Sequence, residues 1–361
     1  YQGAHGYAYH LNADKFAQLL AKNAQEKFNV KHILANVSEV ELSVEGEVAA
    51  LHTKEYGRLS YDFFIDCTGF ESLIMEKALK VPFVSKAKDL LVNKALVVQV
   101  PTDENDEIPP YTLATAHQAG WIWDIALTNR RGVGFVYSDN HMSDEEASRK
   151  LDKYLGEKSK DLTYRALPMR IGHCEKFWHK NCVVLGLAQG FLEPLEATSI
   201  LLTDFAASFL ARKFPKNNSE MMVLTKRFNK VMDYAWLRVI DFIKLHYYLS
   251  DRKDSQFWLD NQKEEALTNS LKQQLALWRG FTPHPDDFFA QFEVFNVDNY
   301  LYLLYGMNFS TVPKSLSSQE IEEATLHADK IKRAIDFIER KLPCHRRLLN
   351  NLHQQYLSKL V

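Results

Sequence analysis

The sequence has few cysteines, no long apolar run and no surplus of charge of either sign. Its 361 residues include 44 Lys and Arg and 46 Asp and Glu, a formal net charge of −2. This balance argues against nucleic-acid binders and polybasic membrane proteins, which need clustered positive charge to meet phosphates. No apolar run approaches the roughly 20 residues that cross a bilayer, and the first ten residues lack a signal-peptide layout. We therefore expect a cytoplasmic protein without nucleic-acid or membrane partners.

The four cysteines are scattered along the chain, at Cys67, Cys174, Cys182 and Cys344. None forms a Cys-x-x-Cys pair or stands with histidine at zinc-finger spacing, so we expect no metal site. So few cysteines favour a reducing compartment in which the thiols are buried. With 46% hydrophobic and 25% charged residues, the chain can bury a large core. Its length indicates two or three lobes of about 150 residues each.

The first two hundred residues alternate between helical and strand patterns. Asn12 is placed to cap a helix that begins at Ala13, and a second helix is predicted over residues 199–213. Strand patterns occupy residues 31–37, 40–44, 48–53, 63–67, 95–100, 113–117, 121–127, 133–137 and 183–185. The turn Glu-Gly-Glu at 45–47 predicts an antiparallel ribbon formed by 40–44 and 48–53.

Beyond Pro215 the strand signals become rare and long helical patterns replace them. These patterns cover residues 221–248, 264–278, 297–305, 319–341 and 346–357. We therefore place a domain boundary near Asn217, with a mixed α/β lobe over residues 1–216 and a helical lobe over residues 217–361.

The most informative stretch spans residues 181–200. A strand ends at Leu185 and leads into Gly-Leu-Ala-Gln-Gly at 186–190, a proline turn and the start of a helix. Small residues let a backbone approach a ligand closely, and free N–H groups at a helix start attract anions. For the glycine loop alone, a tight connection without a ligand is the better explanation, because such loops are common. Glu193 and Glu196, set between apolar residues, favour a functional site instead.

Several motifs of this chain resemble one enzyme family. The segment Gly-Phe-Leu-Glu-Pro-Leu-Glu-Ala-Thr-Ser-Ile at 190–200 closely resembles the Phe-Leu-Glu-Pro-Leu-Glu-Ser-Thr signature of flavin-dependent tryptophan halogenases. Further resemblances to the family are Tyr-Ala-Tyr-His-Leu-Asn-Ala at 7–13, Asp-Phe-Phe-Ile-Asp-Cys-Thr-Gly at 62–69, Gly-Trp-Ile-Trp-Asp-Ile at 120–125, and the segments 170–173 and 177–182. The motifs follow the family's order, and the similarity weakens after about Trp258.

The resemblance implies an α/β, flavoprotein-monooxygenase-like FAD-binding lobe followed by a mainly helical substrate lobe. In that family, FAD reduced by a separate flavin reductase reacts with oxygen and oxidises bound chloride or bromide to hypohalous acid. A lysine then presents the halogen to an indole or another electron-rich aromatic such as tryptophan. The resemblance thus implies a small aromatic substrate and a flavin reductase as partner, and a homodimer is a further expectation.

The resemblance also assigns roles to the residues around the proline turn. Glu196 corresponds to the catalytic carboxylate that assists the lysine, and Thr198 and Ser199 correspond to the halide site. Amides at a helix N-terminus are suitable donors to a halide, and the same positive helix end would favour an ionised Glu196. The alternative for Glu196 is simple capping of the helix.

Cofactor contacts are implied for the glycine loop, namely Gly186, Leu187, Ala188, Gln189 and Gly190, together with Asp66 and Gly69. For Asp66, capping of the run that starts at Glu71 is an equally good explanation. Trp121 and Trp123 alternate along one strand, so both indoles point to the same face. The resemblance places them between flavin and substrate, whereas core packing is the alternative. Ala126 stands where the family has a proline, so the conformation of the backbone at this position is not fixed by the resemblance.

Substrate recognition departs from the family pattern. Phe295, within 292–300, falls where a tryptophan is usual, and the upstream paired tyrosines are replaced by Asp-Phe-Phe at 287–289 or lost. Stacking on Phe295 remains a route to binding an aromatic ring. We therefore predict an indole or another uncharged aromatic in preference to free tryptophan.

Two family features are absent from the sequence: a Gly-x-Gly-x-x-Gly loop and a lysine that matches the halogen carrier. We expect both upstream of Tyr1, in a larger polypeptide. One alternative function is flavin-dependent hydroxylation of an aromatic, against which Trp121, Trp123 and Glu196 argue. The other is a non-catalytic binding protein on a degenerate flavoprotein scaffold, which Ala126 and the altered helical lobe make conceivable.

Overall fold

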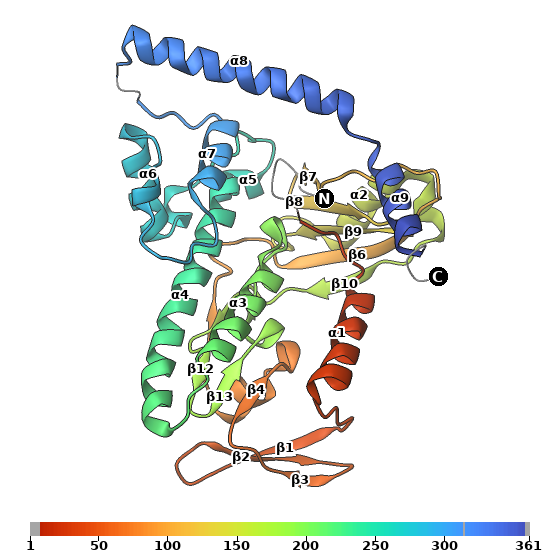
Figure 1. Ribbon diagram of the computed structural model, residues 1–361, viewed down its shortest axis with the longest axis vertical. Coiled ribbons are helices and arrows are strands. Elements are labelled where there is room, and N and C mark those ends of the chain that lie inside the picture. Colours follow the sequence, from red (N-terminus) through yellow and green to blue (C-terminus); the bar gives the residue numbers. More distant parts are fainter. Residues whose placement is uncertain (1–7, 313–314, 358–361) are drawn as a thin grey trace.

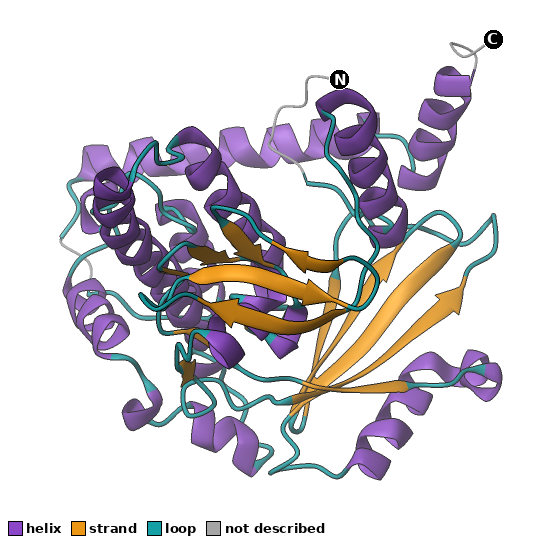
Figure 2. Ribbon diagram, turned by 90° about the horizontal axis from the view of Figure 1, so that it is seen from below, coloured by secondary structure: helices purple, strands orange, loops and turns teal. Residues whose placement is uncertain are grey.

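The computed structural model describes residues 8–312 and 315–357. Tyr7, the first residue of the motif at 7–13, lies outside these ranges. The five-stranded sheet lies at one side of the molecule and most helices at the other (Figure 2). Helix α8 (Ser318–Lys341) crosses one end of the molecule, and a small β-ribbon forms the opposite end (Figure 1).

The N-terminal part contains α1 (Ala13–Phe28) and the ribbon of β1 (Val37–Leu42), β2 (Val48–Thr53) and β3 (Gly57–Leu59). Asn12 caps α1 as predicted, since its side chain accepts a hydrogen bond from the Lys15 amide at 3.2 Å. The β1–β2 pairing is antiparallel, which confirms the predicted ribbon. The predicted strand at 31–37 is wrong except for its last residue. Among the described residues, 31–36 have no partner strand, and Leu34 is 83% exposed.

A five-stranded antiparallel sheet follows in the order β10 (Arg165–Pro168), β6 (Lys94–Pro101), β9 (Arg130–Tyr137), β8 (Gly120–Ala126) and β7 (Leu113–His117). The sequence predicted all of these strands except β10. It also missed α2 (Asp144–Leu155), which contacts β9 and buries Ala147, Leu151 and Leu155 on one face. These three residues recur every four positions, the spacing of a helix with one buried stripe.

Two smaller sheets contain the strands that lead into the predicted site. In the first, β13 (Cys182–Val184) lies between β12 (Trp178–His179) and β4 (Phe64–Asp66), and it runs parallel to β4. In the second, β11 (Gly172–Cys174) lies between β14 (Gly190–Phe191) and β5 (Phe83–Ser85). Because the parallel strands β4 and β13 end at the same edge, the loops that follow Asp66 and Val184 meet there.

The helical part contains α3 (Thr198–Arg212), α4 (Asn218–Tyr248), α5 (Gln256–Asn261), α6 (Asn269–Gly280), α7 (Val297–Gly306), α8 and α9 (His345–Leu357). These bounds confirm the predicted helices with one exception. The helix predicted over 264–278 is interrupted, because Thr268 caps α6 by accepting a hydrogen bond from the Leu271 amide at 3.1 Å. A short 3-10 turn, Glu264–Ala266, precedes that break.

Helix α4 connects the two predicted lobes. Its N-cap is Asn217, at the predicted boundary, where the side chain accepts from the Glu220 amide at 2.9 Å. Further along α4, Trp236 packs against His173 and Phe177 of the α/β part. The buried apolar side chains form one continuous core across the boundary. In contrast, α8 buries none of its side chains.

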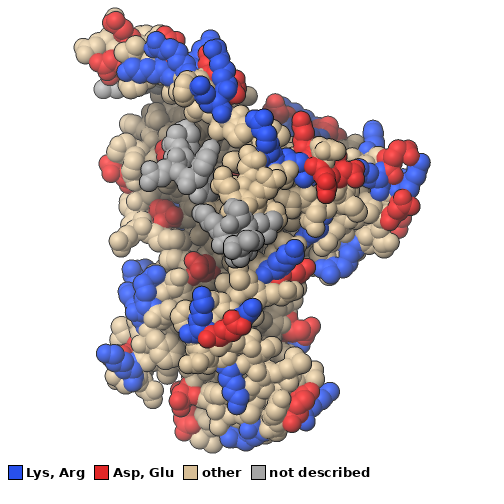
Figure 3. Space-filling view, turned by 45° about the vertical axis from the view of Figure 1, so that its right-hand side comes forward, with Lys and Arg blue, Asp and Glu red and all other residues tan. Residues whose placement is uncertain are grey.

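The surface carries both signs of charge. Lys and Arg alternate with Asp and Glu over the face in Figure 3, as expected from the balanced composition. Among the described residues, no helix is both long and apolar enough to cross a membrane, and no group of histidine, cysteine and carboxylate side chains has the arrangement of a metal site.

Candidate active site

The glycine loop after β13 has a backbone that requires glycine at two positions. Gly186 has φ +63°, a left-handed conformation, and the space where a Cβ would stand is open. At Gly190 a Cβ would lie 2.5 Å from the carbonyl oxygen of Gly172 and 2.7 Å from the indole of Trp236. The first glycine leaves room for a ligand to approach the backbone, whereas the second lets β14 pair closely with β11.

Asp66 holds the neighbouring loop together. Its Oδ1 accepts hydrogen bonds from the amide and hydroxyl of Thr68, at 3.0 and 2.6 Å, and its Oδ2 accepts from the amides of Ile74 and Met75, at 3.0 and 2.8 Å. The fully buried carboxylate thus caps a π-helical turn, Leu73–Ala78, rather than the run from Glu71. Gly69, with φ +67°, begins a short turn that lies against Gly186–Ala188.

A pocket of about 190 Å³ joins the glycine loop to the start of α3. Its lining residues are Gly186, Leu187, Gln189, Gly190, Ser199, Ile200, Thr203 and Trp236. Leu187 is 43% exposed, whereas Ala188 is buried beneath the loop. The structure therefore brings most of the predicted cofactor residues and Ser199 around one cavity.

Two hydrogen-bond donors beside this pocket have no acceptor among the described residues. They are Nε2 of Gln189 and Nε1 of Trp236, and both side chains are buried. Buried donors without a partner are rare in folded proteins, because each costs free energy unless a ligand or water accepts its hydrogen bond. The donors thus fit a polar ligand at the pocket.

Glu193 is buried at the inner side of the proline turn. Its Oε2 accepts hydrogen bonds from Nε1 of Trp121 at 2.9 Å and from the hydroxyl of Tyr247 at 2.5 Å. Burial raises the pKa of the Glu193 carboxyl to about 7, although both hydrogen bonds oppose the shift. Glu193 therefore links the five-stranded sheet to the last turn of α4.

Glu196 lies on the open side of the same turn. Its backbone (φ +70°) and that of Ala197 (φ +51°) are both left-handed, a conformation that costs free energy for residues other than glycine. The side chain is 32% exposed, and its Oε1 lies 3.0 Å from Nε2 of His246 on α4. Glu196 does not cap α3, because the N-cap is Ala197 and no side chain caps this helix start.

The two predicted halide residues begin α3. Thr198 is 4% exposed, whereas Ser199 is exposed and lines the pocket beside the glycine loop. The first amides of a helix have no acceptor within it. With no side-chain cap at this helix start, the structure leaves those amides for another acceptor.

The two tryptophans of β8 point to the same face, as predicted. Trp121 pairs with Val136 and Trp123 with Gly134, so the two indoles stand on alternate positions of one strand. A Cβ at Gly134 would lie 2.3 Å from the Trp123 ring, which shows that this indole lies flat over the glycine backbone of β9. Ala126 ends β8 in regular pairing with Arg131, so the missing proline leaves the strand intact.

Phe295 belongs to an aromatic cluster of the helical part. It is 6% exposed and stacks on Phe242, with ring centroids 3.9 Å apart. Phe242 also contacts the ring of His246, which in turn reaches Glu196. Phe295 is therefore two side chains away from the predicted catalytic carboxylate, with one ring face covered.

Sequence reasoning missed the residues of α4 that complete this site, namely Trp236, His246 and Tyr247. All three occur within a continuous helical pattern that indicated only a buried helix. The apolar side chains around His246 and Tyr247 gave no signal that both meet the proline turn.

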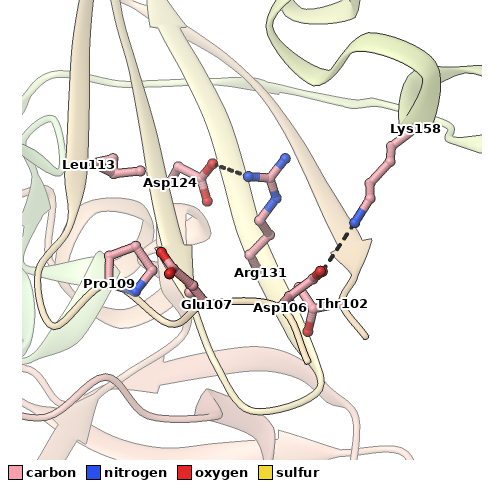
Figure 4. A pocket seen from close by; sticks show the side chains of 9 residues that line it. Thr102, Asp106, Glu107, Pro109, Leu113, Asp124, Arg131 and Lys158 are labelled. Atoms are coloured by element: carbon pink, nitrogen blue, oxygen red, sulfur yellow. Dashed lines mark hydrogen bonds and ion pairs between the residues drawn. The ribbon is translucent and has the colours of Figure 1, made fainter. Parts of the chain in front are cut away.

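A second pocket, of about 300 Å³, lies beside β8 and β9 (Figure 4). Asp124 accepts a hydrogen bond from Arg131 at 2.9 Å, and Lys158 pairs with Asp106 at 3.2 Å. These residues form two separate ion pairs, and none of the predicted site residues lines this pocket.

Comparison with known proteins relates the chain to characterised enzymes. The model of the tryptophan halogenase family matches residues 1–321. Tryptophan 6-halogenase SttH of Streptomyces toxytricini is 37% identical over 301 residues, covering 83% of this chain and 57% of that protein. Tryptophan 6-halogenase ThaL of Streptomyces albogriseolus is 33% identical over 367 residues, covering 97% and 68%. The chain thus spans about 57–68% of the length of these curated relatives.

Solved structures agree with the sequence matches. The tryptophan halogenase of Shewanella frigidimarina superposes with a TM-score of 0.91 at 37% identity, covering 95% of this chain and 66% of that one. BrvH, a flavin-dependent halogenase from Brevundimonas sp. BAL3, superposes with a TM-score of 0.85 at 32% identity, covering 95% and 69%. This likeness confirms the predicted fold class, a mixed α/β lobe of halogenase type followed by a helical part.

Proposed function

Because this chain belongs to the tryptophan halogenase family, we propose that the complete protein carries out flavin-dependent halogenation of an indole or another electron-rich aromatic. One observation supports this more than any other. Glu196 stands on a strained, partly exposed turn, between an uncapped helix start and the aromatic cluster of the helical part. A carboxylate in that place can orient an ammonium group or accept a proton from a substrate ring.

The residues around the glycine loop fit the flavin. Gly186 leaves open space beside its backbone, Leu187 offers an exposed apolar surface, and Gln189 has an unpartnered donor. We assign FAD binding to Gly186–Gly190, with Gly69 against the loop and Asp66 shaping the turn beneath it. Bound in reduced form, FAD supplies with oxygen the oxidising power that turns a halide into an electrophile.

The halide site is assigned to Thr198 and Ser199. The start of α3 offers amides that no side chain caps, and the helix dipole favours an anion there. Ser199 lines the same pocket as the flavin loop, so a halide at this end would lie beside the cofactor. Chloride and bromide both suit such a site, because it selects by charge.

The tryptophans support halogenation over the alternative of hydroxylation. The hydrogen bond to Glu193 fixes Trp121, and Trp123 lies flat on the sheet over Gly134. Held in this way, the two indoles would form a wall between cofactor and substrate, which halogenation through a separate carrier requires and direct oxygen transfer does not.

We further propose that residues 1–216 contribute to the FAD-binding domain and that residues 217–361 cover the substrate. A separate flavin reductase would supply the reduced cofactor, in a cytoplasmic setting. A homodimer is consistent with the family, and the oligomeric state in solution tests it.

The substrate proposed is an uncharged aromatic such as indole. Asp287, where the family has a tyrosine pair, accepts hydrogen bonds from Nε1 of Trp278 and from the His284 amide, each at 2.9 Å. Phe289 is 91% exposed. Neither residue is placed as a donor to an amino-acid carboxylate, and Phe295 offers at most one ring face.

Turnover assays on the complete protein test the proposal. The protein is supplied with FAD, a flavin reductase, oxygen and bromide or chloride, and is offered indole and tryptophan side by side. Mass spectrometry should detect a halogenated product, with a higher kcat/KM for indole. A product that carries oxygen in place of halogen would establish the hydroxylase instead, and flavin binding without any product would favour the binding protein.

A further inference from the structure

Helix α8 is anchored just beyond both of its ends, and none of its 24 residues is buried (Figure 1). On the N-terminal side, the amide of Val312 donates to the carbonyl oxygen of Arg279 at 2.7 Å. On the C-terminal side, Nδ1 of His345 lies 2.9 Å from the carbonyl oxygen of Ile108. The chain thus holds the ends of α8 in place and leaves the length of the helix exposed.

One apolar stripe follows α8 from its first turn to its last. Its members recur at alternating spacings of three and four residues, namely Ile321, Ala324, Ala328, Ile331, Ile335 and Ile338. These are the spacings of the a and d positions of a heptad repeat, through which helices pair in coiled coils. Ile321, Ile331 and Ile335 are 53%, 61% and 51% exposed. Such a stripe in contact with water indicates a surface for another helix.

We propose that α8 is the interface between two copies of this chain, whose α8 helices pair antiparallel about a two-fold axis at the middle of the helix. The six residues of the stripe are called the α8 seam below. A second copy supplies a helix of the same length and pattern, so the seam can be covered from end to end. The inference does not depend on the proposed reaction, and it gives the proposed homodimer a defined contact surface.

The sizes of the seam residues fit this arrangement. The middle of α8 lies between residues 329 and 330. A two-fold axis there makes each seam residue face one residue of the second copy, in the pairs Ile321 with Ile338, Ala324 with Ile335 and Ala328 with Ile331. Two of these three pairs set a small side chain against a large one, which fills the space between helices. Parallel helices would instead set alanine against alanine in two layers.

The charges that flank the seam also fit. In the antiparallel arrangement Glu320 faces Lys341 of the second copy, and symmetry repeats this pair. The amide and hydroxyl of Ser317 donate to Oε2 of Glu320 at 2.7 and 2.8 Å. These bonds hold the pKa of the Glu320 carboxyl below its usual value, so it is ionised at neutral pH. The described structure gives Lys341 no ion pair of its own, and its Nζ lies 6.0 Å from the centre of the Phe337 ring.

The remaining flanking positions favour the same orientation. Antiparallel helices bring Thr325 opposite Lys332 and His327 opposite Ala334, so neither pair joins two basic side chains. Parallel helices would bring His327 beside Lys332 instead. Charge at such positions determines how two helices orient. Side-chain size and charge therefore select one arrangement of the two copies.

The first experiment measures the mass of the complete protein by sedimentation equilibrium over a series of concentrations. We expect the wild type to form a dimer. Ile331→Asp should raise the Kd of that dimer roughly 100-fold or more, because each dimer would bury two carboxylates that have no partner. Ile331 is 61% exposed in the single chain, so the exchange should leave each copy folded.

The matched control is Leu326→Asp on the same helix. Leu326 is 50% exposed and lies on the face of α8 opposite the seam. The control introduces the same charge in place of a similar side chain, so the Kd of the dimer should keep its wild-type value. Circular dichroism of both variants verifies that their helix content is that of the wild type.

Disulfide cross-linking determines the orientation of the helices. The exposed Cys67 and Cys344 are first replaced by serine. One copy then carries Ala328→Cys, and a second copy with a different tag carries Ile331→Cys. The antiparallel seam predicts disulfides between the unlike copies, whereas parallel helices would join like copies. Mass spectrometry of the oxidised mixture distinguishes them, and it decides the matter if Ile331→Asp does not fold.

Three results would overturn the inference. The first is a complete protein that stays monomeric at every concentration. The second is a dimer whose Kd is the same in Ile331→Asp as in the wild type, since the copies would then meet elsewhere. The third is a set of disulfides between like copies only. If Ile331→Asp lowers the stability of a monomer and Leu326→Asp does not, another part of the same chain covers the seam. Because none of these measurements uses turnover, a failure of the proposed halogenation would leave the interface unaffected.

Discussion

The proline turn has an inner end and an outer end, and each carries a glutamate bound by α4. At the inner end, residues 190–193, Glu193 is 1% exposed and bonds to Tyr247 and Trp121. At the outer end, residues 195–198, the side chain of Glu196 is 32% exposed and contacts His246. The two carboxylates are three residues apart, and their partners on α4 are adjacent.

The difference between the ends shows how burial assigns chemistry to identical side chains. At the inner end desolvation raises the pKa of Glu193 to about 7, and the two donors tie this carboxyl to the sheet and to α4. At the outer end the side chain of Glu196 is partly exposed to water and lies beside the imidazole of His246. We propose that the inner end stabilises the turn and that the outer end carries the catalytic carboxylate.

The largest effect is expected at the outer end. Glu196→Gln in the complete protein should cut halogenation by roughly 10² or more, the usual cost of a lost acid–base group. Flavin binding and the free energy of unfolding should stay at their wild-type values, because the side chain of Glu196 is partly exposed. Product formation, flavin titration and urea unfolding measure the three quantities. Glu339→Gln on α8 is the control, and halogenation at the wild-type rate in Glu196→Gln would refute the assignment.

The inner end should instead give an effect on stability. Glu193→Gln keeps an oxygen that accepts from Trp121 and Tyr247 but removes the ionisation. Folding raises the pKa of Glu193 from 4.5 to about 7, so the unfolded chain ionises first as the pH rises. Wild-type stability should therefore fall relative to Glu193→Gln between about pH 4.5 and 7, by on the order of 3 kcal/mol.

Urea unfolding of both proteins over that pH range measures the difference. The range should end near pH 7.5, because burial lowers the pKa of Lys244 to about 8 and its contribution rises with pH above that value. Glu339→Gln is again the control. A stability difference independent of pH would mean that Glu193 does not titrate with folding.

The sequence predicted the elements whose pattern is local. Strand alternation located β6 to β9, helical spacing located α4 and α7, and Asn12 marked a helix start. The motif at 190–200 located the proline turn with both carboxylates. Contacts between distant parts of the chain could not be predicted. His246 and Tyr247 are about fifty residues from the turn in sequence, and neither stands in a motif of its own. The capping role of Asp66 was only one of two open explanations.

A smaller effect should come from the backbone of the inner end. Gly190→Ala places a methyl group 2.5 Å from the carbonyl oxygen of Gly172 and 2.7 Å from the Trp236 ring. Neither neighbour is a flexible chain end, so the strand pair β11–β14 must shift. We expect a loss of about 2 kcal/mol in unfolding free energy, with weaker flavin binding. Gly306→Ala, where a Cβ meets nothing within 4 Å, is the control.

The smallest effect is expected from the reverse exchange, alanine to glycine, at the outer end. Ala197 has φ +51°, where a side chain costs roughly 1–2 kcal/mol and glycine costs nothing. Ala197→Gly removes that strain but gives the unfolded chain more freedom, worth about 0.4–1 kcal/mol in the opposite direction. The net change in unfolding free energy should lie between about 0 and 1.6 kcal/mol on the stabilising side. If Ala197 is needed to restrict the backbone of Glu196, kcat will fall in Ala197→Gly while the free energy of unfolding is unchanged. Turnover assays and urea unfolding of the same variant measure the two quantities. A clear loss of stability would mean that the methyl group packs against neighbours, and the turn would then be held by contacts at both ends.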